Sequence, residues 1–136
     1  MIFGNTIFGI TYQERPAAYV VITDEGGRIA AVKGKRGYFL PGGGSLPDET
    51  PEETIKRELR EELAREVEIT EKIGEVIQYF SAGDGHYKMK ATFYKASFAS
   101  ERQGESEHEL CWIGDTDAAE IFFHECHKWA VNQIKH

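Results

Sequence analysis

The chain has 136 residues, of which 40% are hydrophobic and 12% aromatic, so residues 1–136 are expected to form a single packed domain. Its 16 Lys and Arg against 23 Asp and Glu give a formal net charge of -7, which would repel a nucleic-acid polymer. There is no basic leader before an apolar run, and no stretch of about 18 apolar residues, so we expect a soluble, cytoplasmic protein that does not bind membranes. Two cysteines, Cys111 and Cys126, are too few for a disulfide framework and are expected to be reduced.

The first predicted elements are strands. Residues 17–40 contain two apolar runs on either side of a turn from Asp24 to Gly27, a pattern that predicts a β-hairpin. A further short strand, Tyr38 to Leu40, leads into Pro41 and three consecutive glycines.

A helix is predicted from Pro51 to about Arg65. Thr50 suits the N-cap, proline suits the first helical position, and Glu53 stands three residues after Thr50, as a capping box requires. Apolar residues recur at every fourth position and form the stripe that faces the core: Ile55, Leu59 and Leu63.

The second half of the chain is predicted to contain a hairpin, a loop, a strand and a helix. Residues 67–80 and 86–98 are β-rich runs joined by the turn "SAGDG", and residues 99–109 are polar. A short strand at 110–113 and an amphipathic helix at 115–134 follow. Strands that alternate with two helices predict an α/β (α+β) fold with a mixed β-sheet sandwiched between helices.

The helix that follows the glycines carries a crowded acidic surface. Glu58, Glu61 and Glu62 are three or four residues apart or adjacent, so they share one patch and repel one another. A bound divalent cation would relieve this repulsion, and ligands that are all oxygen favour Mg²⁺, Mn²⁺ or Ca²⁺ over zinc. The alternative is a solvated helix with ion pairs at i to i+4 spacing, of which Glu52 and Lys56 are one example.

The three glycines before the helix favour the metal or ligand site over the solvated helix. Gly42, Gly43 and Gly44 allow the backbone to approach a ligand or metal closely and expose its N–H and C=O groups. They are not a P-loop, because no Gly-Lys-Ser or Gly-Lys-Thr follows.

The spacing of this segment resembles the Nudix box, G-x5-E-x7-R-E-U-x-E-E-x-G-U, in which U is apolar. Gly43, five residues, Glu49, seven residues and then "RELREELA" at 57–64 match it, and the order of the elements on both sides extends the resemblance over most of the chain. Ala64 replaces the glycine of the box, and Arg65 replaces its last apolar residue. Because alanine adopts a left-handed turn reluctantly, the helix is expected to run further or to exit by a different turn.

The resemblance implies a Nudix-like domain that hydrolyses a nucleoside diphosphate linked to another group X, with Mg²⁺ or Mn²⁺ as cofactor. The substrate would be a small phosphorylated molecule, and family analogy makes a homodimer plausible. The implied metal ligands are the carboxylates of Glu58, Glu61 and Glu62 and the carbonyl of Gly42.

The resemblance also implies roles for other residues. Arg57 and Glu49 match the pair that braces the loop against the helix. The general base varies within the family. One candidate is Glu58, and the other is a glutamate of the late loop, residues 99–109, which precedes Trp112. This loop offers Glu105, Glu107 and Glu109, of which we favour Glu107 narrowly over Glu109.

Basic residues just before the glycines are candidates for phosphate binding. Lys33, Lys35 and Arg36 could meet phosphate oxygens beside the backbone of Gly43 and Gly44, or they could be ordinary solubilising charges. Five aromatic side chains could stack on a base but are more typical of a sheet core: Tyr38, Phe39, Tyr79, Phe80 and Tyr87.

The "HECH" stretch at 124–127 places two histidines one helical turn apart. A zinc site would need more ligands, and Cys111 is the obvious addition only at a distance, so we expect packing instead, with Cys126 and Trp129 facing inward.

Two other kinds of protein remain as alternatives: a non-catalytic domain of the same fold that binds a nucleotide or a partner, and a plain acidic structural domain. The intact box carboxylates favour the enzyme.

Overall fold

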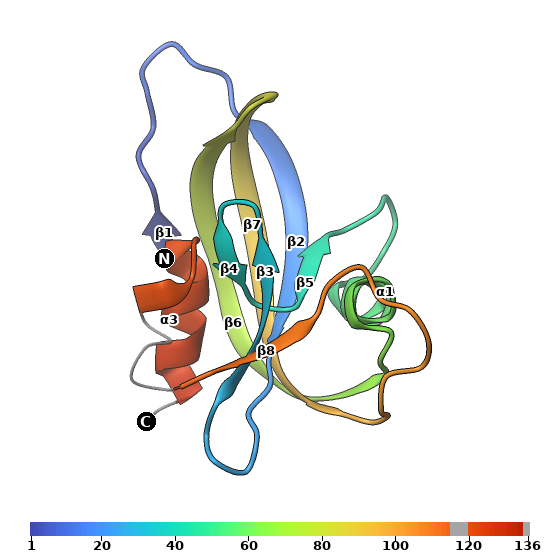
Figure 1. Cartoon of the computed structure of the whole chain (residues 1–136). Coiled ribbons are helices and arrows are strands. Elements are labelled where there is room, and N and C mark those ends of the chain that lie inside the picture. Colours follow the sequence, from blue (N-terminus) through green and yellow to red (C-terminus); the bar gives the residue numbers. More distant parts are fainter. Residues whose placement is uncertain (115–119, 135–136) are drawn as a thin grey trace.

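The computed structural model describes residues 1–114 and 120–134, which form two β-sheets flanked by helices α1 and α3 (Figure 1). The strand order is β1-β6-β7-β2-β5 in one sheet and β4-β3-β8 in the other. The larger sheet is mixed, because β1 pairs with β6 and β2 with β7 in parallel while the other pairs are antiparallel. This confirms the predicted α+β fold with a mixed sheet between helices. The elements are β1 (Ile2–Phe3), β2 (Gln13–Val21), β3 (Ile29–Gly34), β4 (Gly37–Phe39), β5 (Gly42–Gly44), α1 (Pro51–Leu63), β6 (Val67–Ala82), β7 (Gly85–Phe98), β8 (Leu110–Ile113) and α3 (Glu125–Ile134).

The long β6–β7 hairpin and the strand β8 are confirmed where the sequence predicts them. The polar residues between β7 and β8 contain no helix or strand, as predicted. None of the helices in the described part of the chain is long and apolar enough to cross a membrane.

The first predicted hairpin is wrong in its pairing. The turn is present, since the N–H of Gly27 donates to the carbonyl of Asp24 at 3.0 Å. Beyond a single bridge between Thr23 and Ile29, however, β2 and β3 separate into different sheets. Both edges of β2 are already paired, with β7 along its whole length and with β5, so β3 pairs with β4 and β8 instead.

Helix α1 begins as predicted. The N–H of Glu53 donates to Thr50 Oγ1 at 3.1 Å, and the N–H of Thr50 donates to Glu53 Oε1 at 2.9 Å, so the capping box is closed. The predicted stripe faces the core, and its three members are at most 2% exposed: Ile55, Leu59 and Leu63.

The end of α1 differs from the expectation. The helix stops at Leu63, and Ala64 does adopt the left-handed conformation, with φ 54° and ψ 40°. Neighbouring contacts hold this turn: the carbonyl of Ala64 accepts the N–H of Gln103 at 2.7 Å, and the guanidinium of Arg65 lies 3.7 Å from the centre of the Phe98 ring. Arg65 thus covers an aromatic ring at the position where the box has an apolar residue.

The C-terminal helix is shorter than predicted. Part of its expected start, residues 115–119, lies outside the described residues, and α3 begins only at Glu125. Phe122 instead forms a parallel bridge with Tyr38, and the N–H of Phe123 donates to the carbonyl of Tyr38 at 2.9 Å. Glu120 and Ile121 are helical, and the bridge at Phe122 with the bends at Phe123 and His124 separates them from α3.

Candidate active site

The glycine strand β5 lies against helix α1 because its residues lack side chains. A Cβ on Gly43 would lie 2.8 Å from the carboxyl carbon of Glu58, and one on Gly42, whose φ is +137°, would lie 2.2 Å from the carbonyl oxygen of Ala18. The close approach allows the N–H of Gly42 to donate to Glu62 Oε1 at 2.9 Å. The glycines therefore let the carboxylates of α1 reach the backbone of the sheet.

Arg57 joins the loop after β5 to the acidic surface of α1. Its Nε and Nη2 atoms donate to the two carboxylate oxygens of Glu49 at 2.7 and 3.0 Å, and Nη2 also donates to the carbonyl of Gly44 at 2.9 Å. Its Nη1 atom donates to Glu58 at 2.9 Å and to Glu61 at 3.2 Å. The forked geometry fixes the loop on the helix.

This pairing also fixes the charge of Glu49. The hydrogen bonds from Arg57 and from the N–H of Leu46 lower the pKa of Glu49 to about 2, so the carboxylate stays ionised. The expected contact between Arg57 and Glu49 is thus present and charged on both sides.

The carboxylates of α1 lie in an environment that opposes their charge. Burial is the main factor that raises the pKa of Glu62 to about 8, and the neighbouring charges of Glu58, Glu107 and Glu61 raise it further against the bond from Gly42. Burial likewise raises the pKa of Glu58, although Arg57 opposes the shift. Such a cluster is stable only when protons or cations neutralise it.

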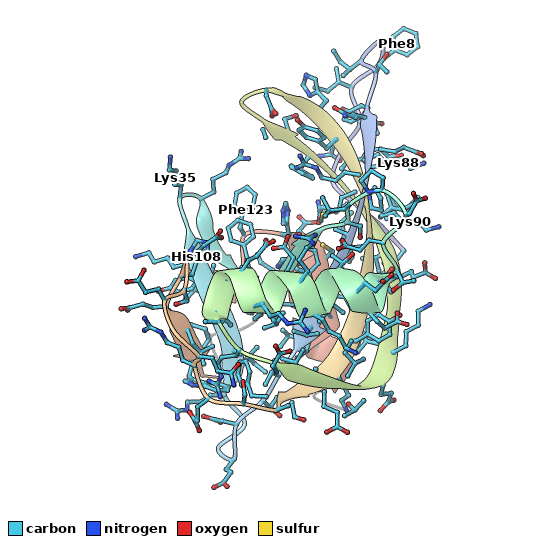
Figure 2. All side chains as sticks on the ribbon, turned by 90° about the vertical axis from the view of Figure 1, so that its right-hand side faces the viewer. Phe8, Lys35, Lys88, Lys90, His108 and Phe123 are labelled. Carbon is cyan, nitrogen blue, oxygen red and sulfur yellow. The ribbon has the colours of Figure 1, made fainter. Side chains whose placement is uncertain are left out.

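The late loop closes over the C-terminal end of α1. The N–H of Glu107 donates to the carbonyl of Glu61 at 3.3 Å, and the N–H of His108 donates to the carbonyl of Glu62 at 2.9 Å, so both satisfy carbonyls of the last helical turn. Figure 2 shows His108 beside α1. Glu107 is close enough for its charge to raise the pKa of Glu58 and Glu62, whereas Glu109 lines a different hollow with Leu63 and Arg102.

A hollow of about 200 Å³ opens on the other side of β5. Gly44 lines it, and the carbonyl of Gly44 accepts a hydrogen bond from Arg57 of α1 at 2.9 Å. Two arginines and a histidine supply its charged and polar side chains, and aromatic rings form much of its wall. The lining residues are Arg15, Ala17, Tyr19, Arg36, Phe39, Gly44, Phe80, Met89, Phe123 and His124.

Of the three basic residues predicted to meet phosphate, only Arg36 lines this hollow. Its Nη1 atom donates to the carbonyl of Ser81 at 3.1 Å, and its guanidinium lies 4.7 Å from the centre of the Phe123 ring. Lys35 lies at the tip of the β3–β4 hairpin (Figure 2), and Lys33 Nζ lies 5.9 Å from the ring centre of Tyr38.

Six lining residues were not among the predicted contacts: Arg15, Ala17, Tyr19, Met89, Phe123 and His124. The period-two pattern of a strand places Arg15 on the same face as Ala17 and Tyr19, so the sequence did contain a signal for it. Phe123 and His124 lie in the segment predicted to be helical, where no such pattern could identify them.

The "HECH" residues pack as predicted. His127 is fully buried and accepts a hydrogen bond of 3.1 Å from the N–H of Leu40 at Nδ1. Burial, and to a lesser extent the charge of Arg36, lower the pKa of His124 to about 4, so its ring is neutral. Cys126 is buried with a free thiol, and Trp129 packs against the core cluster on the α3 side.

The fold, the glycine strand and the braced acidic helix together define a Nudix-type pyrophosphohydrolase, an enzyme acting on phosphorus anhydrides. The family model described as NUDIX domain matches residues 13–131, and the chain belongs to this family.

Solved structures of similar proteins cover nearly the whole chain. A MutT Nudix hydrolase from Burkholderia pseudomallei is 28% identical, with a TM-score of 0.73 over 90% of this chain and 98% of that one. A MutT protein from Methanosarcina mazei Go1 is 18% identical, with a TM-score of 0.72 over 93% and 96% of the two chains. An ADP-ribose pyrophosphatase from Streptococcus suis is 18% identical, with a TM-score of 0.63 over 89% and 87%. A search among curated proteins found no match.

Proposed function

We propose that this chain hydrolyses the diphosphate bond of a nucleoside diphosphate linked to another group X, with Mg²⁺ or Mn²⁺ as cofactor and water as the attacking group. The observation that carries the proposal is the convergence of the α1 carboxylates on the glycine strand, with Glu62 bonded to the N–H of Gly42 and Glu58 against Gly43. A diphosphate is anionic, and a cluster that is itself anionic can accept it only with cations between them.

The donors fit a hard divalent cation, because all of them are oxygen: the carboxylates of Glu58, Glu61 and Glu62 and the carbonyl of Gly42. Within residues 1–114 and 120–134, no group of three His, Cys, Asp or Glu side chains has the geometry to hold a metal in the observed conformation. Arg57 explains this arrangement, since it draws Glu58 and Glu61 toward itself. Ligation would therefore require these two side chains to turn away from Arg57, which remains bonded to Glu49.

When bound, the cation would supply charge neutralisation and a water of lowered pKa. The residues of the chain would do the rest. Arg57 and Glu49 keep β5 and α1 together, which keeps the Gly42 carbonyl beside the carboxylates. Glu107 is our candidate for the group that accepts the proton of the attacking water, because it lies near Glu58 and Glu62 while its side chain makes no hydrogen bond within the described residues. Glu58 remains the second candidate.

The hollow beside β5 supports a nucleotide as the substrate. Its aromatic walls, which include Phe39 and Phe80, can take a flat base by stacking, and Arg15 and Arg36 add positive charge for phosphate oxygens. An ADP-ribose pyrophosphatase is among the similar structures, so ADP-ribose is tested beside the nucleoside triphosphates. The -7 net charge argues against a nucleic-acid polymer.

The test is a panel of nucleoside triphosphates, dinucleoside polyphosphates and nucleotide sugars, including ADP-ribose, assayed with Mg²⁺ for phosphate or pyrophosphate release. We expect hydrolysis of at least one compound, loss of activity in EDTA and recovery with Mg²⁺ or Mn²⁺. Activity that persists in a metal-free preparation would contradict the proposal, as would binding without hydrolysis across the panel, the result expected of a non-catalytic domain.

A further inference from the structure

His127 is a polar residue in an apolar site. It is fully buried in α3, and its ring lies 4.3 Å from that of Tyr19, 5.8 Å from that of Phe93 and 6.1 Å from that of Phe39. Because Nδ1 accepts the N–H of Leu40, the neutral ring must carry its proton on Nε2. Within the described residues, Nε2 is buried and has no hydrogen-bond partner. An unsatisfied buried N–H is costly, so the one favourable polar contact of this ring, the bond that it accepts from Leu40, is what distinguishes it from an apolar side chain.

The hydrogen bond of His127 is one of three that hold consecutive residues before the acidic cluster. The N–H of Leu40 is held by His127 of α3, and the carbonyl of Pro41 accepts the N–H of Val20 of β2 at 3.0 Å. The N–H of Gly42 donates to Glu62 of α1 at 2.9 Å. Three different elements thus each fix one residue of the segment Leu40–Gly42.

We propose that His127 is a positioning residue: by holding the N–H of Leu40, it orients the Leu40–Gly42 segment so that the Gly42 carbonyl and the Glu62 carboxylate face the same cation. The inference rests on the proposed function, because it assumes that these oxygens bind the cation. The segment has little freedom to compensate for the loss of this bond. Leu40 is fully buried, and Gly42 lies directly against the backbone of Ala18 and Tyr19.

The test uses two variants of nearly equal shape, His127→Asn and His127→Leu. Asparagine offers a carbonyl oxygen near the former Nδ1, whereas leucine offers no acceptor. The measured quantities are the dissociation constant for Mn²⁺ alone, from electron paramagnetic resonance, and the Tm of the metal-free protein. His127→Leu should weaken Mn²⁺ binding at least tenfold while its Tm stays near the wild-type value, because removal of the unsatisfied Nε2–H offsets the loss of an acceptor for the buried Leu40 N–H. His127→Asn should bind Mn²⁺ within threefold of wild type even where its Tm is lower.

A purely structural role predicts the opposite ranking, in which metal affinity follows Tm. Val131→Ala is the matched control, because Val131 is fully buried in the same helix. This variant should lower Tm and leave the Mn²⁺ affinity unchanged. The inference is wrong if His127→Leu binds Mn²⁺ within threefold of wild type, or if His127→Asn loses as much affinity as His127→Leu.

Amide hydrogen exchange in the metal-free protein tests the inference separately from the proposed function. In His127→Leu, exchange at Leu40 and Gly42 should accelerate at least tenfold relative to Phe93 in β7, whereas in Val131→Ala it should not. If the wild-type protein fails to bind Mn²⁺, the proposed cofactor is wrong while the exchange result still decides whether His127 orients the segment. Unchanged exchange in His127→Leu overturns the inference, including where His127→Asn does not fold.

Discussion

Glu62 is mostly protonated at neutral pH in the metal-free protein, because burial and the charges of Glu58, Glu107 and Glu61 raise its pKa to about 8. A cation that binds this carboxylate must therefore displace a proton, so the affinity for the cation is expected to rise with pH. Burial raises the pKa of Glu58 in the same direction, although the bond from Arg57 opposes that shift.

The raised pKa of Glu62 predicts how the stability of the metal-free protein depends on pH. The folded state holds this proton more tightly than the unfolded state, so the stabilisation is complete below the unfolded pKa of about 4.5 and is lost as the pH rises through about 8. Between pH 6.5 and 8.5, the free energy of unfolding should fall by on the order of 1 to 2 kcal/mol in the wild type and stay nearly constant in Glu62→Gln. Urea unfolding in EDTA measures this difference, and equal slopes in the two proteins would show that Glu62 is ionised when folded.

At the scale of the element, α1 ends in a conformation that its sequence does not favour. Ala64 has φ 54°, and a left-handed alanine costs about 1 kcal/mol relative to glycine. The contacts of Arg65 with Phe98 and with the carbonyl of Ser100 hold the exit in place. The helix is thus terminated by its surroundings and not by a glycine.

Ala64→Gly should therefore stabilise the protein by about 0.5 to 1 kcal/mol, because glycine adopts φ > 0 without strain. Its activity should remain within threefold of wild type, since the carboxylates lie before this turn. Ala99→Gly is the control, because Ala99 is exposed and has no positive φ, so there the added freedom of the unfolded chain should destabilise. A loss of stability in both variants, measured by urea unfolding, would mean that the exit of α1 is not strained.

The elements that could be predicted are those whose signals are local. The start of α1 was predicted correctly because the capping box of Thr50 and Glu53 lies within four consecutive residues. The β6–β7 hairpin was predicted correctly because a short turn joins two β-rich runs that are neighbours in the sequence. The predictions of the pairing of β2 and of the exit of α1 were wrong because distant residues determine both. β2 pairs with β7 and β5, and the exit of α1 is held by Gln103 and Phe98. The same limit applies to the site, where the box spacing predicted the contact of Arg57 with Glu49 but nothing predicted that His127 holds Leu40.

At the scale of the whole molecule, the site forms where separate segments meet on either side of β5. The acidic end of α1 and the late loop lie on one side, and the hollow lined by β2, Phe80, Met89 and the segment before α3 lies on the other. A substrate with a base in the hollow would therefore extend its phosphates along the glycine strand toward the carboxylates. The chain as a whole carries a net charge of -7, so cations and the arginines of the hollow would have to offset the repulsion of the proposed substrate.

The most direct test of this account compares Glu62→Gln with Glu66→Gln in the hydrolysis of the best substrate with Mg²⁺. Glu62 lies in the cluster, whereas Glu66 pairs with Arg60 at 2.7 Å on the surface beyond the helix. Glutamine keeps the shape of each side chain and removes its charge, so Glu62→Gln should lower kcat by about 10²-fold or more, the scale of losing a catalytic group. Glu66→Gln should change kcat by less than about threefold, because an exposed ion pair contributes little. Equal losses in the two variants, or a normal kcat of Glu62→Gln at limiting Mg²⁺, would contradict the account and leave the acidic helix as a salt-bridged surface.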